Sequence, residues 1–228
     1  MGRGRGTRGV AAAVSRVRQG WLGGTFDPIH CGHLDVARAA HDALSLDTVH
    51  LVPGRVPPHR LAPHASAEHR LAMVRLAATS AGWLRVSDIE MASDAPSYTM
   101  ETLDRLSAGG TALDTLHVIT GADAFAGILS WKGAENLLSR CHFVVVSRPG
   151  HPAPGLRQTL PALAAQMRHP ADYDDRLQPS IFLVDAPTAP VSSTKIRALA
   201  STGSSLAGLV PRAVAEYIDR NALYRGVA

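Results

Sequence analysis

Short apolar runs alternate along the chain with longer stretches in which apolar residues recur every three or four positions. Runs of the first kind predict β-strands, and the spacing of three or four predicts helices that bury one face. A more polar run at 19–22, just before two glycines, predicts a strand more weakly. The clear strand predictions are 48–52, 84–87, 116–120, 142–146 and 181–184.

Four stretches between or after these runs predict helices. Ser66 is a suitable N-cap for the predicted helix that contains Leu71 and Val74. Pro211 suits the first turn of the predicted helix that contains Val214. The faces expected to be buried contain, in chain order, Leu34, Ala37, His41 and Leu44; Leu71, Val74 and Ala78; Met100, Leu103 and Leu106; and Val214, Tyr217 and Ile218.

The alternation of strands and helices indicates right-handed βαβ crossovers and a parallel sheet covered on both faces. We therefore expect an α/β fold, with a doubly wound parallel sheet in a single domain and a small helical part at the C-terminus. In such sheets ligands bind beyond the carboxyl ends of the strands, where the strand order reverses. Residues 149–179 are polar, contain prolines and lack periodicity, which predicts a surface excursion between two strands.

The composition agrees with a globular protein. Of the 228 residues, 46% are hydrophobic and 18% are charged, which is not typical of a disordered chain. No apolar run approaches the roughly 20 residues that span a bilayer, so we expect no membrane partner. The two cysteines, Cys31 and Cys141, have no CxxC spacing, and we expect a reducing, cytoplasmic location.

The net charge of +4 originates at the N-terminal end of the chain. Residues 1–20 contain five arginines and no acidic residue, whereas the remainder carries 18 Lys and Arg against 19 Asp and Glu. We therefore expect no nucleic-acid partner for the folded domain. We predict a disordered, Arg-rich extension at 1–19 and a folded domain at 20–228. An early start codon and an organellar transit peptide are alternative interpretations of the extension.

A glycine pair follows the first predicted strand and leads into a helix that we expect to begin near Gly32. Glycine lets the backbone approach a ligand closely, and the first turn of a helix presents N–H groups to an anion. His30 and His33 are three residues apart and share a helical face. Two imidazoles beside an anion site suit phosphoryl-type transfer, in which the protein positions groups and stabilises developing charge.

The residues of this loop also allow other interpretations. A glycine pair is common in ordinary turns, and two histidines at this spacing are often surface or packing residues. His30, Cys31 and His33 are also three possible metal ligands. A structural zinc site would need a fourth ligand, and the sequence has no second Cys/His cluster at suitable spacing.

The whole segment Gly23-Gly24-Thr25-Phe26-Asp27-Pro28-Ile29-His30-Cys31-Gly32-His33-Leu34 resembles the HxGH signature of the nucleotidyltransferase superfamily. It is similar in particular to the bacterial nicotinate-nucleotide adenylyltransferases. The resemblance implies a Rossmann-like fold and an enzyme that transfers AMP from ATP to a phosphate. It implies catalytic roles for His30 and His33, and ATP-binding roles for Gly23, Gly24, Thr25, Phe26 and Gly32.

A second motif, Val191-Ser192-Ser193-Thr194-Lys195-Ile196-Arg197, has the composition of a capped helix start. The N–H groups of such a start and a nearby guanidinium suit a phosphate. The motif resembles the superfamily's second ATP motif, which implies ATP binding by Ser192, Ser193 and Thr194 and a catalytic role for Arg197. Gly121 and Asp123 resemble the family's motif near the ATP ribose.

Four further segments of the resemblance concern the acceptor, although each by itself is an ordinary loop or core element. They are Pro57-Pro58-His59-Arg60, Pro96-Ser97-Tyr98-Thr99, Trp131 and Ser147-Arg148-Pro149-Gly150. The resemblance implies that the mononucleotide is bound by His59, Arg60, Tyr98, Thr99, Trp131 and Arg148. The C-terminal Ala222-Leu223-Tyr224-Arg225 is similar to the family's closing segment, whereas Lys132 stands where the family commonly has an aromatic residue.

These resemblances imply a reaction of nicotinate mononucleotide with ATP, which carries Mg²⁺, to give nicotinate adenine dinucleotide and pyrophosphate. No metal site on the protein itself is expected, because magnesium in such sites depends on phosphate oxygens and water. Nicotinamide mononucleotide and phosphopantetheine are alternative acceptors. A non-catalytic nucleotide-binding module is the alternative outside the enzymes. The sequence is compatible with a homo-oligomer and does not determine the oligomeric state.

Overall fold

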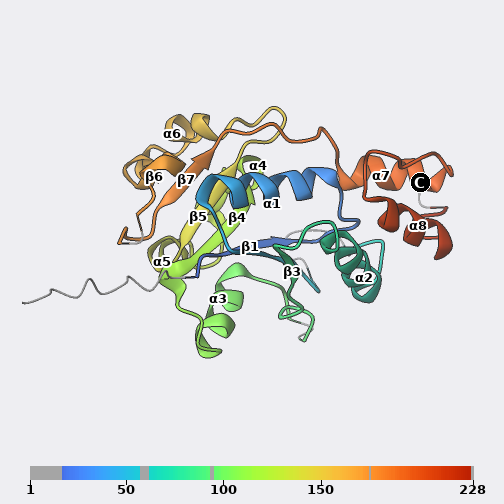
Figure 1. The fold of residues 1–228 in the computed structure, drawn as a ribbon, viewed down its shortest axis with the longest axis horizontal. Coiled ribbons are helices and arrows are strands. Elements are labelled where there is room, and N and C mark those ends of the chain that lie inside the picture. The colour runs from blue at the N-terminus through green and yellow to red at the C-terminus, as the bar shows by residue number, and fades with distance from the viewer. Residues whose placement is uncertain (1–16, 57–61, 93–94, 175, 227–228) are drawn as a thin grey trace, which may run out of the picture.

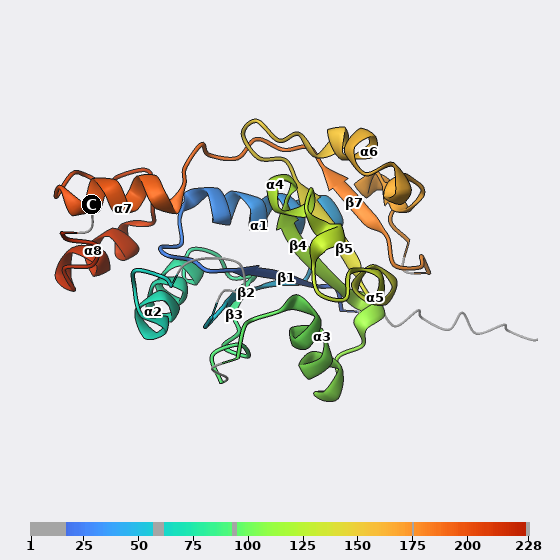
Figure 2. The same ribbon diagram turned by 180° about the vertical axis from the view of Figure 1, so that it is seen from behind.

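The computed structural model describes residues 17–56, 62–92, 95–174 and 176–226. In this part of the chain, seven parallel strands form one sheet in the order β3-β2-β1-β4-β5-β7-β6, with helices on both faces (Figure 1, Figure 2). The strands are β1 (Gln19–Gly24), β2 (Thr48–Pro53), β3 (Leu84–Val86), β4 (Leu116–Gly121), β5 (His142–Val146), β6 (Met167–Arg168) and β7 (Ile181–Val184). The helices are α1 (Cys31–Leu44), α2 (Ala67–Ala78), α3 (Thr99–Ala108), α4 (Ala122–Phe125), α5 (Ala134–Arg140), α6 (Leu156–Thr159), α7 (Ser193–Ser201) and α8 (Arg212–Arg220). The predicted doubly wound α/β fold is confirmed.

The strand order reverses at β1. The chain moves outward from β1 through β2 to β3, returns to the other side of β1 with β4, and then continues outward to β5. The carboxyl ends of β1 and β4, at Gly24 and Gly121, are therefore the point where doubly wound sheets bind ligands. The loop that carries the two histidines begins at this point.

Two hydrophobic cores lie on opposite faces of the sheet, because successive side chains of a strand point to opposite faces. In β5, Val144 and Val146 belong to one core, whereas Phe143 and Val145 belong to the other. Helices α1, α2, α7 and α8 cover the first face, and α3, α4, α5 and α6 cover the second. All of β5 is buried, as expected for a central parallel strand.

The predicted helices are present, but their buried faces differ in part. Ser66 caps α2, as predicted, by accepting a hydrogen bond from the His69 N–H. The predicted Leu34 and His41 are only half-buried, because α1 approaches the sheet through smaller side chains beside them. Pro211 is the N-cap of α8, one position before its predicted place. The buried residues of α1 are Gly32, Val36, Ala37, Ala40 and Leu44.

The prediction of a surface excursion at 149–179 was wrong. This segment contains 3-10 turns, the short helix α6 and the edge strand β6. It buries Leu156, Leu160, Leu163 and Met167, whose spacing is helical, and they join the second core. Prolines interrupt the segment, so the helical spacing is distributed over short turns and did not stand out as a helix.

The folded part begins before the predicted boundary at residue 20. Gln19 is the first residue of β1, and the Arg18 N–H donates to the Asp47 carboxylate at 2.8 Å. The Arg18 guanidinium also lies over the Tyr173 ring, 4.6 Å from its centroid. Residues 1–16 of the predicted extension lie outside the described residues. Within the described ranges, no helix combines the length and the apolar character needed to cross a bilayer.

Two buried histidines lie at the amino ends of the central strands. His117 of β4 and His142 of β5 stack with their ring centroids 5.0 Å apart, and both side chains are almost fully buried. Burial lowers the pKa of His117 to about 3, and the neighbouring His142 adds to the effect. The folded protein therefore keeps His117 uncharged at a pH where the unfolded chain would protonate it.

We predict that the free energy of unfolding decreases as the pH falls from about 6.5 to 4. The pKa of His117 is lower in the folded state, so the unfolded chain takes up an extra proton over this range, worth about 1.4 kcal/mol per pH unit. In the variant His117→Phe, the free energy of unfolding from urea titrations should depend less steeply on pH. The slope should decrease by the equivalent of about one proton. The exposed His151→Gln is the control and should keep the wild-type slope. An unchanged slope in His117→Phe would contradict the assignment.

Candidate active site

A cavity of about 640 Å³ lies over the carboxyl ends of β1 and β4 and extends to α3. This volume is typical of small-molecule sites. A second hollow, of about 510 Å³ around residues 109–115, contains none of the predicted site residues. The predicted residues that line the first cavity are Gly23, Gly24, Thr25, Phe26, His33, Thr99, Gly121, Asp123, Trp131, Arg148, Ser193, Thr194 and Arg197. The fold thus brings residues from most of the chain to one place.

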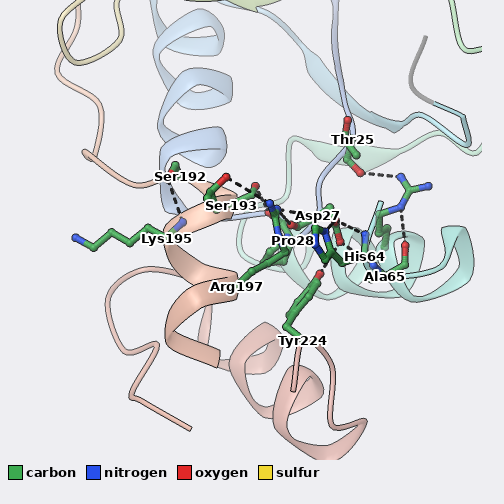
Figure 3. A network of polar contacts seen from close by, with 12 residues as sticks. Thr25, Asp27, Pro28, His64, Ala65, Ser192, Ser193, Lys195, Arg197 and Tyr224 are labelled. Atoms are coloured by element: carbon green, nitrogen blue, oxygen red, sulfur yellow. Dashed lines mark hydrogen bonds and ion pairs between the residues drawn. The ribbon is translucent and has the colours of Figure 1, made fainter. Parts of the chain in front are cut away.

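The buried carboxylate of Asp27 is the centre of the polar network beside this cavity (Figure 3). It accepts hydrogen bonds from the N–H groups of His64 (2.8 Å) and Ala65 (3.1 Å), and from the Tyr224 hydroxyl (2.9 Å). The Arg197 guanidinium donates to the Asp27 carbonyl oxygen at 2.8 Å and lies 3.9 Å from the carboxylate. Asp27 therefore joins the β1 loop to the segment before α2, to α7 and to the C-terminal end.

Gly24 and Phe26 determine the shape of the loop after β1. Phe26 has a left-handed backbone conformation, with φ 49°, which is uncommon for a bulky residue. Its buried ring meets His33 edge-on, with centroids 5.0 Å apart. A Cβ on Gly24 would lie 2.9 Å from the Phe26 ring, so glycine is required for this packing. The loop thereby supports the His33 ring at the cavity.

The rings of His30 and His33 stack with their centroids 3.6 Å apart, but of the two only His33 lines the cavity. The His33 Nδ1 accepts a hydrogen bond from the His30 N–H at 3.2 Å, so the proton of a neutral His33 is on Nε2. Burial lowers the pKa of His30 to about 4, and Arg148 adds to the effect. At neutral pH His30 is therefore uncharged, and the stacked pair carries at most one positive charge.

The second predicted motif forms the start of α7. Ser192 caps this helix by accepting a hydrogen bond from the Lys195 N–H at 3.2 Å, and the Ser193 hydroxyl donates to the Pro28 carbonyl at 3.0 Å. Both hydroxyls therefore fix the helix in place. The capacity to bind an anion lies in the N–H groups of the first turn and in the guanidinium of Arg197, the fifth residue of the helix. Ser192 does not line the cavity, although its neighbours do.

Arg148, which the resemblance predicts to bind the mononucleotide, lies between the two predicted ATP motifs. Its guanidinium donates to the carbonyl oxygens of Gly32 (3.1 Å) and Val191 (3.4 Å), one from each predicted ATP motif. A Cβ on Gly32 would lie 2.9 Å from this guanidinium, so the glycine makes room for it. The Arg148 side chain also packs against Gly121, beside Asp123.

The other end of the cavity is mainly apolar. Tyr98 caps α3 without lining the cavity, and the Lys132 Nζ lies 4.5 Å from its ring centroid. The predicted His59 and Arg60 lie outside the described residues. The apolar lining at this end belongs to the face of the sheet that α3 covers, and it includes Trp21, Val52, Leu103, Leu106, Val118 and Trp131, with Thr99 beside them.

Several residues that line or support the site had no predicted role. Asp27 and Tyr224 stood inside segments of the resemblance, and their bond joins positions 197 apart in the chain. His64 and Glu90 line the cavity without belonging to a recognised motif. Glu90, an acidic residue that follows a strand shortly before a predicted substrate segment, was a signal that could have been used.

Comparison with known proteins assigns the chain to a family. A family model described as cytidylyltransferase-like matches residues 21–199. The probable nicotinate-nucleotide adenylyltransferase of Pseudomonas entomophila (strain L48) is 43% identical over 223 residues, which cover 95% of this chain and 99% of that protein. The chain belongs to the nicotinate-nucleotide adenylyltransferase family. A family member from Moorella thermoacetica (strain ATCC 39073 / JCM 9320) is 38% identical, over 91% of this chain and 92% of its own.

Solved structures of this family share the fold. The Plasmodium falciparum nicotinic acid mononucleotide adenylyltransferase complexed with NaAD superposes with a TM-score of 0.71 at 16% identity, over 92% of this chain and 98% of that one. A putative nicotinate-nucleotide adenylyltransferase from Vibrio parahaemolyticus gives a TM-score of 0.60 at 18% identity, over 93% and 98%. At these identities the structures establish the common fold, and family membership rests on the sequence relatives.

We predict that Tyr224→Phe lowers the free energy of unfolding by about 1.5–3 kcal/mol, because the buried Asp27 carboxylate loses a charge-assisted hydrogen bond. Burial and the adjacent carboxylate raise the pKa of Tyr224, so its hydroxyl remains a donor at neutral pH. The control is Tyr217→Phe, which removes a hydrogen bond of 3.0 Å between a half-buried hydroxyl and His69. This variant should lower the free energy of unfolding by less than about 1 kcal/mol. Equal losses in urea unfolding would contradict the role of Asp27.

Proposed function

We propose that this chain is an adenylyltransferase that transfers AMP from ATP to nicotinate mononucleotide, with nicotinate adenine dinucleotide and pyrophosphate as products. The observation that carries the proposal is the cavity, which continues from the two phosphate motifs to an apolar end at Trp131 and α3. The names of the relatives, and the NaAD in the Plasmodium falciparum structure, support the same acceptor.

The proposed reaction is a direct displacement at the α-phosphorus of ATP. An oxygen of the mononucleotide 5′-phosphate forms the new bond to phosphorus. The bond from that phosphorus to the oxygen that bridges to the β-phosphorus breaks, and its electron pair leaves with pyrophosphate. Because the attacking phosphate is already an anion, the protein needs to supply no nucleophile and no general base.

The protein then contributes position and charge stabilisation. His33, with its Nε2 as donor, stabilises the α-phosphoryl group, and His30 keeps the His33 tautomer through its main-chain N–H. Arg197, Arg148 and the first turn of α7 hold the β- and γ-phosphates, which become the leaving group. Asp123, in α4 directly after β4, suits the hydroxyls of the ATP ribose.

Mg²⁺ enters this reaction as part of the substrate, bound to phosphate oxygens of ATP and to water. Among the described residues, no group of three or more His, Cys, Asp or Glu side chains is arranged to hold a metal ion. We place the reaction in the cytoplasm, as the sequence predicts.

A pyrophosphate-release assay with ATP and one acceptor at a time tests the substrate. Nicotinate mononucleotide should give the highest kcat/KM, with nicotinamide mononucleotide and phosphopantetheine lower by at least about tenfold. A higher kcat/KM for another acceptor would replace the proposed substrate. Failure to release pyrophosphate with any acceptor would favour a non-catalytic nucleotide-binding module.

The variant His33→Ala should lose at least about a hundredfold in kcat, because removal of one preorganised donor typically costs about 2.7–4 kcal/mol in the barrier. Circular dichroism and thermal melting should show that the variant folds normally. The exposed His169→Ala is the matched control and should keep the wild-type rate. A near-wild-type kcat for a folded His33→Ala would overturn the proposed role of this side chain.

A further inference from the structure

The guanidinium of Arg70 in α2 is fully buried and connects the two loops that follow β1 and β2. It donates hydrogen bonds to the main-chain carbonyl oxygens of Thr25 (2.7 Å), Gly54 (2.6 Å), Arg55 (2.9 Å) and Ala65 (3.3 Å). Thr25 belongs to the loop between β1 and α1, residues 25–30, which we call the phosphate loop. Segment 54–55 follows β2, and Gly54 lines the cavity together with residues of α3, at what we call its acceptor end. One side chain therefore holds both loops.

Glu90 holds the same segment through a second group of contacts. Its buried carboxylate accepts hydrogen bonds from the hydroxyls of Ser97 and, at 2.5 Å, of Thr102 in α3. The Ser97 oxygen in turn accepts a hydrogen bond from the Arg55 N–H at 3.1 Å. A Cβ on Gly54 would lie 3.3 Å from the Glu90 carboxylate, so this carboxylate packs directly against the segment.

These contacts form a continuous polar chain from the phosphate loop to α3. It runs from the Thr25 carbonyl through Arg70, segment 54–55, Ser97 and Glu90 to Thr102. Side chains of α3 line the acceptor end of the cavity, and Thr25 lines the phosphate end. The distance between the attacking phosphate and the α-phosphorus depends on how these two ends are placed relative to each other.

We propose that Arg70 and Glu90 are positioning residues for the mononucleotide, which together hold segment 54–55 and so fix the acceptor end of the cavity relative to the phosphate loop. This inference rests on the proposed function and names the residues that set its acceptor geometry. Burial of two charged groups is costly, and an apolar pair would fill the same space more cheaply for folding alone. The chain of hydrogen bonds to both ends of the cavity gives these charges a function in binding.

The variant Ser97→Ala tests the link between Glu90 and segment 54–55. It removes one hydroxyl and keeps the main-chain bond from the Ser97 N–H to the Val56 carbonyl. We expect KM for nicotinate mononucleotide to rise about tenfold, with KM for ATP within about twofold of wild type and a modest decrease in the melting temperature, because the buried Glu90 carboxylate loses one donor. The control Ser107→Ala, on an exposed part of α3, should leave both KM values unchanged.

The variant Arg70→Lys tests the other link, because a lysine cannot reach four carbonyl oxygens in different directions. It should raise KM for the mononucleotide and also lower kcat, since the Thr25 carbonyl loses its donor. In the double variant with Ser97→Ala, the rise in KM should be smaller than the product of the two single effects, because both act through segment 54–55. If Arg70→Lys does not fold, Ser97→Ala and its control decide.

Three results would overturn this inference. The first is an unchanged mononucleotide KM in Ser97→Ala, and the second is an equal rise of both KM values in that variant. The third is a double variant whose effect equals the product of the single ones. Each of these requires an active wild-type protein in the same assay. A wild-type protein that turns over no mononucleotide would instead overturn the proposed function, and this inference with it.

Discussion

The buried carboxylate of Asp27 is the interaction on which the rest of the site depends. A carboxylate away from water is stable only when donors surround it, and here the donors come from segments far apart in the chain. Satisfying this one charge therefore positions the segment before α2, the Arg197 guanidinium of α7 and the C-terminal Tyr224. The phosphate loop after β1 is held in place because its Asp27 carboxylate is hydrogen-bonded to the segments around it.

This arrangement explains how a small set of groups can stabilise a phosphoryl transition state. The reversal of strand order at β1 opens the crevice, and the glycines let the backbone reach it. The rings of His30 and His33 are stacked. Burial, with a contribution from Arg148, lowers the pKa of His30 so that this ring is neutral at pH 7, and the His33 ring lines the cavity. In the proposed reaction, the guanidiniums of Arg148 and Arg197 supply the permanent positive charge for the leaving group. Preorganisation in this sense means that little rearrangement is needed when ATP binds.

Local features of the sequence were enough to predict six of the seven strands, the histidine loop and the start of α7, because apolar runs, glycines and helix caps are signals carried by neighbouring residues. Contacts between distant segments were not predictable. Arg70 appears in the sequence as one basic residue in a helical stretch, and its four carbonyl partners lie in segments that only the fold brings together. The contacts of Arg148 with the Gly32 and Val191 carbonyl oxygens were likewise beyond local prediction, because they join three segments far apart in the chain. The helical spacing in 149–179 was hidden by prolines.

The absence of a protein nucleophile is the central chemical claim, and the stereochemistry at the α-phosphorus tests it most directly. The two stacked histidines make the opposite mechanism conceivable, in which a ring nitrogen first accepts the adenylyl group and then passes it to the mononucleotide. With ATP that carries a single sulfur at a chiral α-phosphorus, one direct displacement inverts the configuration, whereas two successive displacements retain it. The structure predicts inversion in the dinucleotide product. Retention of configuration would contradict the account.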